Sequence, residues 1–519
     1  MATVQRLTPP AASSRRLIGL LCAAVIPLAV FALLAPTLHM ALVGDDYEWI
    51  QYTRRVPDRP DLFFSRMGNY FRPSTTLVFL IDRALWGINP LGYRLDNLLV
   101  HSANGILLLL ASMRLRLHHV TALCVALLWV TSPYSIEIAT QPAMLADALL
   151  ALGLLGLAAA WPRSGEDWSR ARIALAGVST AMAICSKETW VVTPAIALVL
   201  ERFHHGSSWR KSLRAMAPFL IALVAYLVLY LPTEPREQWR TYEYDIAPMA
   251  KIPHLFSAFL QMQEPVPVGF PVGWKGLLAT LVVLLAGWYA LRSRSAPGAL
   301  GLCLLLLPLI PVALIPYMPT RYIAIPYLGF LLLAASLAET AAQHSRWVTA
   351  LLLALAGLVG IAGLNVARAE VADYARISER SQRLLDEARR IVDVFPIDVP
   401  VLFLRAESRD ICAELAQQSL GLNKVYYVRG ADPYGLIETS ALIEYVGTES
   451  GIRVENIQPG DPATMQPVRA KLVHRLGGFF WLPAGDTPAA DLARSYQKSV
   501  HGVRLIRARV LTKGSSRGQ

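Results

Sequence analysis

The chain has 519 residues, of which 54% are hydrophobic and 17% are charged. A mean hydropathy of +0.41 excludes an ordinary soluble protein of this length, because the apolar residues form long blocks. The net charge of +12 does not indicate nucleic-acid binding, since much of the arginine lies in short loops between these blocks, as membrane orientation requires.

Apolar blocks near 20 residues long can cross the hydrocarbon core as helices. Arg15 and Arg16 precede the first block, which is too long for a signal peptide and therefore predicts a retained span. The sequence predicts about eleven spans by block length, at residues 17–38, 95–113, 120–136, 144–161, 173–185, 190–200, 215–232, 277–291, 299–317, 322–337 and 347–364.

Basic residues in the short connections predict the orientation. Short loops that are rich in Arg and Lys stay in the cytoplasm. The N-terminus is therefore predicted inside and the chain after residue 365 outside, and the fifth and sixth spans go out and come back. The basic residues that support this are Arg114, Arg116, Arg163, Arg170, Arg172, Arg202, Arg210, Lys211, Arg214, Arg292, Arg294 and Arg346.

Two long loops, at about 39–94 and 233–276, are predicted on the outer side. The first carries seven arginines, but long loops cross largely regardless of charge. We expect a mainly α fold: a polytopic helix bundle at 1–365 and a small extracytoplasmic α/β domain at 366–519. In that tail, residues 374–392 are helix-like and short β-like runs follow at Val399–Arg405, Lys424–Val428, Ala441–Val446 and Phe479–Leu482.

An acidic pair, Asp45-Asp46, follows the first span directly. One of these carboxylates could act as a general base that deprotonates an attacking hydroxyl, while the other orients the acceptor or holds a cation. A solvated helix end is the alternative, because an acidic pair alone is a weak signal. No cluster, including the five scattered cysteines, has the spacing of metal ligands.

Several short motifs follow one another along the membrane part of the chain. They are Arg72-Pro73, Gly87-Ile88-Asn89-Pro90, Asn97-Leu98-Leu99-Val100-His101, Pro133-Tyr134-Ser135-Ile136-Glu137, Ala146-Asp147, Ser186-Lys187-Glu188 and Arg321-Tyr322 through Gly329-Phe330. This series resembles the multi-spanning GT-C glycosyltransferases over residues 17–340. It is most similar to the protein O-mannosyltransferase-like branch, which includes the transmembrane and tetratricopeptide-repeat proteins.

The chain departs from that branch at three positions. Ser135 replaces a His, Leu145 replaces an Arg, and Thr320 replaces an acidic residue. No tetratricopeptide repeats follow the membrane part. These changes bear on the identity of the acceptor and the donor sugar rather than on the core reaction.

The resemblance implies an enzyme that transfers a sugar, mannose-like, from a polyprenyl-phosphate donor to an extracytoplasmic protein or glycolipid acceptor. It places the catalytic base in the pair Asp45 and Asp46, without choosing between them. Arginine suits the leaving phosphate, because its fixed fork pairs with phosphate oxygens. The substrate-binding candidates are Arg321 first, then Lys187 and Arg72, with Glu137, Asp147, Glu188 and Tyr322 beside them.

Each candidate also has a simpler interpretation. Arg321 could be an interfacial anchor, Lys187 and Glu188 an exposed ion pair, Arg72 a solvated loop cation, and Glu137 and Asp147 helix caps. His101 is expected to be a buried, hydrogen-bonded core residue. No cofactor is expected with the possible exception of a divalent cation at the acidic pair, because related enzymes of the wider superfamily hold one.

Two rival functions are considered. A transporter or flippase of lipid-linked sugars needs ionisable groups deep within the spans, whereas the charged candidates here gather at one face. A catalytically inactive scaffold is the other rival, because the family's His and Arg are replaced. We expect a multi-pass protein of a bacterial inner membrane.

Overall fold

A computed structural model describes most of the membrane part of the chain. The described residues are 12–43, 45–65, 70–230, 251–261, 274–310, 320–343 and 345–392, together with five strands between 401 and 483. The remaining residues include most of the predicted outer loop 233–276 and most of the tail.

The chain divides into two units, which are described separately. The first comprises Met1–Leu38 and Asp58–Ala372, and the second comprises His39–Pro57 and Asp373–Gln519. The acidic pair Asp45-Asp46 belongs to the second unit, while the other candidate residues belong to the first. The domain boundary at 365/366 stays a prediction.

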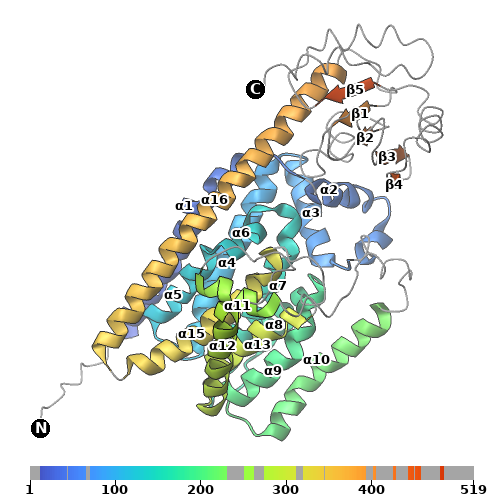
Figure 1. Cartoon of the computed structure of the whole chain (residues 1–519). Helices are drawn as coiled ribbons and strands as arrows, with labels where there is room; N and C mark the ends of the chain where they lie inside the picture. Colours follow the sequence, from blue (N-terminus) through green and yellow to red (C-terminus); the bar gives the residue numbers. More distant parts are fainter. Residues whose placement is uncertain are drawn as a thin grey trace, which may run out of the picture. The chain divides into compact units, whose positions relative to one another are not determined.

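The first half of the first unit consists of helices that pack around α4 (Figure 1). Proline begins α3, α4 and α6, where its missing N–H would have no helical partner anyway. The elements are α1 (Ala12–Leu34), η1 (Ala35–His39), η2 (Pro60–Phe64), α3 (Pro73–Trp86), α4 (Pro90–Arg114), α5 (His119–Val130), α6 (Pro133–Thr140), η3 (Pro142–Met144) and α7 (Leu145–Ala160).

The second half continues the bundle with a short segment, η4, between α8 and α9 and a long helix at its end. Its elements are α8 (Arg170–Ile184), η4 (Glu188–Val192), α9 (Thr193–Val199), η5 (Leu200–His204), α10 (Trp209–Tyr230), α11 (Lys251–Gln261), α12 (Trp274–Arg292), α13 (Ala296–Leu306), η9 (Thr320–Ile323), α15 (Ala324–Ala342) and α16 (Arg346–Val392). The last of these continues into the second unit.

The protein is a multi-pass membrane protein. Seven described helices are long and apolar enough to cross a membrane, or eight when α5 and α6, bent by 62°, are counted as one broken span. Each of the eleven predicted spans contains a helix, but α8, α9 and α13 are shorter than a full span. The count of eleven therefore stays a prediction.

Polar side chains along one face of α4 bind backbone carbonyls around the connection between α6 and α7. The Arg94 guanidinium donates to the Thr140 carbonyl at 2.6 Å, and the amides of Asn97 and Asn104 donate to the carbonyls of Gln141 and Ala148 at 2.7 and 2.9 Å. A break frees backbone carbonyls from their helical partners, and buried carbonyls need other donors. Arg94 and Asn97 supply such donors at the end of α6, and Asn104 binds the first turn of α7.

The second unit contains α2 (Asp45–Arg55) and the end of α16. The Ser378 hydroxyl of α16 accepts a hydrogen bond from the Ala41 N–H at 2.7 Å. Five strands follow, at β1 (Val401–Leu404), β2 (Val425–Tyr427), β3 (Leu442–Thr448), β4 (Gly451–Ile457) and β5 (Phe480–Pro483).

The strands form one mixed sheet in the order β4-β3-β2-β1-β5. The pairs of β1 with β2 and with β5 are parallel, and β2-β3 and β3-β4 are antiparallel. Four strands overlap the β-like runs of the sequence, β3 and β5 extending past the ends of theirs, and β4 lies outside them. A separate extracytoplasmic α/β domain stays a prediction.

Candidate functional site

Three cations and three carboxylates lie together at one end of the first unit. The sequence predicts this end on the outer side of the membrane. They come from the start of α3, from α6, from the first turn of α7, from the segment before and within η4, and from η9. The residues are Arg72, Glu137, Asp147, Lys187, Glu188 and Arg321. We call this group the ionic cluster.

Lys187 and Asp147 form the most buried pair of the ionic cluster. The Lys187 ammonium donates to Asp147 Oδ1, and each side chain is only 7% exposed. Asp147 lies in the first turn of α7, where a carboxylate is also favoured by the helix dipole. The interpretation of Lys187 and Glu188 as an exposed ion pair is therefore wrong, because each binds a partner on another element.

Arg321 is held twice by Glu137. Its guanidinium donates to Glu137 Oε1 at 2.6 Å, and its backbone N–H donates to Oε2 at 2.8 Å. The two side chains are 22% and 15% exposed. Such a two-point contact fixes η9 against α6, which a free interfacial anchor would not do.

Arg72 pairs with Glu188 at 3.3 Å, and its guanidinium lies 4.1 Å from the centroid of the Tyr70 ring. The backbone supports this contact, because the Ser74 N–H donates to the Cys185 carbonyl at 3.0 Å. With its side chain only 12% exposed, Arg72 is not a solvated loop cation.

Tyr322 joins two of the cations. Its ring centroid lies 4.5 Å from the Lys187 ammonium and 5.1 Å from the Arg321 guanidinium, within the range of cation–π attraction. Burial lowers the pKa of Lys187; Asp147 opposes that shift, and Arg72 adds to it. The three cations therefore share one electrostatic environment.

Aromatic side chains pack α6 against α11 and against α15, the helix that follows η9. The Tyr134 ring of α6 lies 4.8 Å from Tyr327 of α15 and 5.2 Å from Phe259 of α11, measured between centroids. The Tyr134 hydroxyl also donates to the Ala258 carbonyl at 2.7 Å. Helix α11, from the second predicted outer loop, thus packs beside the elements that carry Glu137 and Arg321.

The acidic pair begins α2. The Asp46 carboxylate is buried and accepts a hydrogen bond from the Val43 N–H at 3.0 Å. Asp45 is exposed to solvent. The two adjacent carboxylates therefore differ: one caps the start of the helix and the other is accessible.

Metal binding has limited support in the described residues. No group of three or more His, Cys, Asp or Glu side chains within them is arranged to hold a metal ion. At the acidic pair, the described carboxylates are one exposed side chain and one that is already bonded to the backbone. These two do not make a cation site by themselves.

The sequence analysis assigned no structural role to some residues that support the site. Arg94 and Asn97 bind the end of α6 and Asn104 binds the first turn of α7, and their spacing places them on one face of α4. Polar residues recurring on one face of an apolar helix were the available signal. His101, on the same face, is fully buried with Nε2 3.0 Å from the Val130 carbonyl, as expected for a core histidine.

Comparisons with known proteins find similarity only among solved structures. No model of a known protein family and no curated protein matches the chain. The structure is similar to ArnT from Cupriavidus metallidurans bound to undecaprenyl phosphate, at 16% identity and a TM-score of 0.46, covering 82% of this chain and 88% of that one.

It is also similar to the Archaeoglobus fulgidus oligosaccharyltransferase tethered with an acceptor peptide containing the NVT sequon. That match has 13% identity and a TM-score of 0.50, and it covers 80% of this chain and 64% of the other. The resemblance inferred from the motifs is thereby confirmed at the level of fold. The chain therefore has a fold similar to that of this archaeal oligosaccharyltransferase.

Proposed function

We propose that the protein is a membrane glycosyltransferase that moves a sugar, mannose-like, from a polyprenyl phosphate to an extracytoplasmic protein or glycolipid. The observation that carries this proposal is the ionic cluster on a GT-C fold. Three cations from separate segments converge there, each held by a carboxylate.

The cluster suits a phosphate leaving group. When the bond between the anomeric carbon and the phosphate oxygen breaks, its electron pair stays on the phosphate. Arg321 and Arg72 offer planar forks with unused donors, and Lys187 adds a point charge. Cations positioned in advance in a partly dry site stabilise such growing charge strongly.

The carboxylates of the cluster position these cations before a donor binds. Glu137, for example, binds the Arg321 guanidinium with one oxygen and its backbone N–H with the other, so both the side chain and the backbone are held. Preorganisation of this kind removes the cost of reorienting charge during the reaction.

The acceptor hydroxyl would attack the anomeric carbon in line, opposite the phosphate, with inversion. Its proton would pass to a carboxylate of the acidic pair. Asp45 is the better candidate, because the carboxylate of Asp46 already accepts a backbone hydrogen bond and is buried. Asp46 then serves to hold Asp45 in place at the start of α2.

The test measures release of labelled sugar from a polyprenyl-phosphate mannose pool by membranes that contain equal amounts of each variant. We expect Asp45→Asn to lose roughly 100-fold or more, the usual contribution of a general base. Arg321→Gln should lose a similar factor, and Arg321→Lys less, because charge is kept but the fork is lost.

The matched control is Arg59→Gln, which removes an exposed arginine that also pairs with a carboxylate, Asp61, at 2.8 Å. Its release rate should equal that of the wild type. Equal release by Asp45→Asn, Arg321→Gln and the control would contradict the proposal. If the wild type itself releases no mannose, other polyprenyl-phosphate sugars are tried next, and inactivity with all of them would contradict it too.

A further inference from the structure

A second group of charges lies at the opposite end of the same helices. α4 carries Arg94 near its start and Arg114 at its end, and its 25 residues span about 37 Å. α7 carries Asp147 in its first turn and ends just before Trp161. The end of the bundle away from the ionic cluster is the one that the sequence predicts in the cytoplasm.

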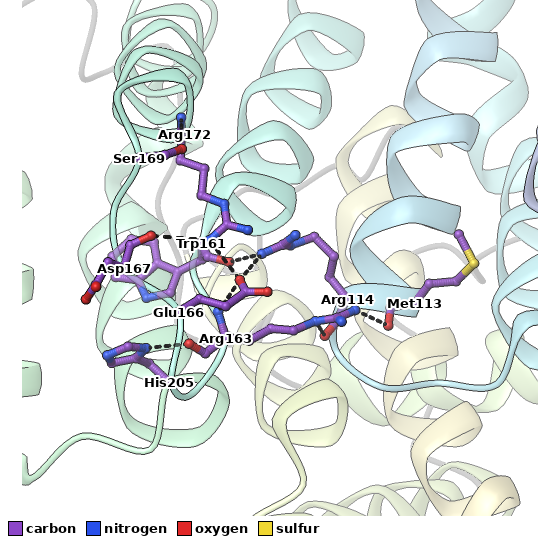
Figure 2. A network of polar contacts seen from close by, with 9 residues as sticks. All are labelled: Met113, Arg114, Trp161, Arg163, Glu166, Asp167, Ser169, Arg172 and His205. Atoms are coloured by element: carbon purple, nitrogen blue, oxygen red, sulfur yellow. Dashed lines mark hydrogen bonds and ion pairs between the residues drawn. The ribbon is translucent and has the colours of Figure 1, made fainter. Parts of the chain in front are cut away.

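Three arginines surround one carboxylate there (Figure 2). Glu166 Oε2 lies 3.0 Å from the Arg114 guanidinium and 2.8 Å from that of Arg172, and it accepts the backbone N–H of Arg163 at 3.1 Å. These hydrogen bonds, the backbone one first, lower the pKa of Glu166 to about 2. The carboxylate is therefore charged, yet three guanidinium groups outnumber it.

Backbone carbonyls fix the arginines in position. The Arg163 guanidinium donates to the carbonyls of Met113 and Arg114 at 3.1 and 3.2 Å, and Arg114 donates to that of Trp161 at 3.0 Å. Carbonyl bonds orient a guanidinium without neutralising it. The positive charge is thus preorganised and is not cancelled by the contacts that hold it.

The surrounding sequence adds further positive charge. Residues 113–116, 161–173 and 200–214 contain nine Arg and Lys against three Asp and Glu. Burial, and then Arg114, Arg163 and Arg116, lower the pKa of His204 to about 4. The Nε atom of Arg114 is buried and has no partner among the described residues.

Two exposed tryptophans of this region are typical of side chains at the level of lipid head groups. Trp168 and Trp209 are 39% and 55% exposed, and the Arg202 guanidinium lies 5.2 Å from the centroid of the Trp209 ring. Tryptophan is enriched at the membrane interface, where its ring is part apolar and part polar.

We propose that this arginine cluster, formed by Arg114, Arg163 and Arg172 around Glu166, binds the phosphodiester head group of an anionic phospholipid from the adjacent leaflet. Guanidinium forks pair with two phosphate oxygens at once. Basic pockets between helix ends are known to take such head groups. The site lies at the end of the helices opposite to the ionic cluster, so it is separate from the proposed transfer of sugar.

The experiment titrates the purified full-length protein in detergent with phosphatidylglycerol or phosphatidylcholine of matched acyl chains. Native mass spectrometry then counts the lipids that each variant retains. The wild type should retain phosphatidylglycerol preferentially. Arg172→Gln should retain it about fivefold more weakly, the factor expected for one cation at a charged lipid surface, and Arg59→Gln should match the wild type.

A Glu166→Gln variant separates lipid binding from a purely structural role. Removing the competing carboxylate should strengthen retention of phosphatidylglycerol, even if the thermal stability falls. Equal retention of the two lipids by the wild type would overturn the proposal. An equal loss of phosphatidylglycerol retention in Arg172→Gln and Arg59→Gln would also overturn it. So would complete displacement of the bound phosphatidylglycerol by inorganic phosphate at the same concentration as the lipid.

Discussion

Asp82 is a buried carboxyl group in the short helix α3, outside the candidate spans. It is 1% exposed, and its Oδ1 has no partner among the described residues. Burial, and then a hydrogen bond and like charge from Asp96 on α4, raise its pKa to about 8. The folded protein therefore binds a proton here at neutral pH that the unfolded chain releases.

The stability of the fold should depend on this proton. An unfolded aspartate titrates near 3.8, so the stabilisation is fully present below that pH and is lost as the pH rises through about 8. In Asp82→Asn the amide replaces the protonated acid, and the decline in melting temperature between pH 4 and 8 should flatten.

Thermal unfolding of the purified protein in one detergent across that pH range gives the measurement. Asp61→Asn is the matched control, because Asp61 is exposed and Arg59 lowers its pKa. A slope that is unchanged in Asp82→Asn, or one flattened equally by both variants, would refute the assignment.

At the scale of the element, the contact between α13 and α15 depends on two glycines. A Cβ on Gly329 would lie 2.4 Å from the Leu305 nitrogen and 2.5 Å from the Gly301 oxygen, which are both backbone atoms. Backbone atoms cannot move aside as a flexible side chain can. Small residues allow helices to approach this closely inside a membrane.

Gly329→Ala should therefore destabilise the protein by about 1–3 kcal/mol, the usual cost of overpacking. Gly177→Ala on α8 is the matched control, because a Cβ there meets nothing within 4 Å. The control should be neutral or should stabilise by about 0.5–1 kcal/mol through helix propensity. Similar melting temperatures for the two variants would show that the helices do not pack this closely.

At the scale of the whole molecule, the ionic cluster and the arginine cluster should face opposite sides of the membrane. A cysteine at position 88, in the loop before α4, should react with an impermeant maleimide in intact cells. One at position 164, beside the arginine cluster, should react only after the cells are opened. Ile88 and Ser164 are both exposed, so accessibility to solvent is comparable.

The labelling uses a background in which the native cysteines are replaced. Four of them, Cys22, Cys124, Cys185 and Cys303, are half-buried. Labelling of both positions in intact cells would contradict a single orientation. The reverse pattern would invert the predicted topology and move the proposed acceptor to the cytoplasm.

The sequence by itself determined the mainly helical class of fold and the positions of the helices in the apolar blocks. Backbone polar groups cannot stay unpaired in hydrocarbon, so long apolar blocks form helices whatever their neighbours. Each of the eleven predicted spans contains a helix for that reason. The residues of the ionic cluster were also identified in advance, through the resemblance that their motifs carry and because arginine and lysine suit a phosphate.

Only the tertiary structure decided the pairing of charges. Lys187 binds Asp147, 40 residues away, Arg72 binds Glu188 across 116 residues, and Arg321 binds Glu137 across 184. The 62° bend between α5 and α6, which lies inside one predicted span, was equally unforeseen, as was the support that α4 gives to the end of α6. Such contacts depend on which helices pack together, and no local pattern of residues encodes the distance between two segments that are far apart in the chain.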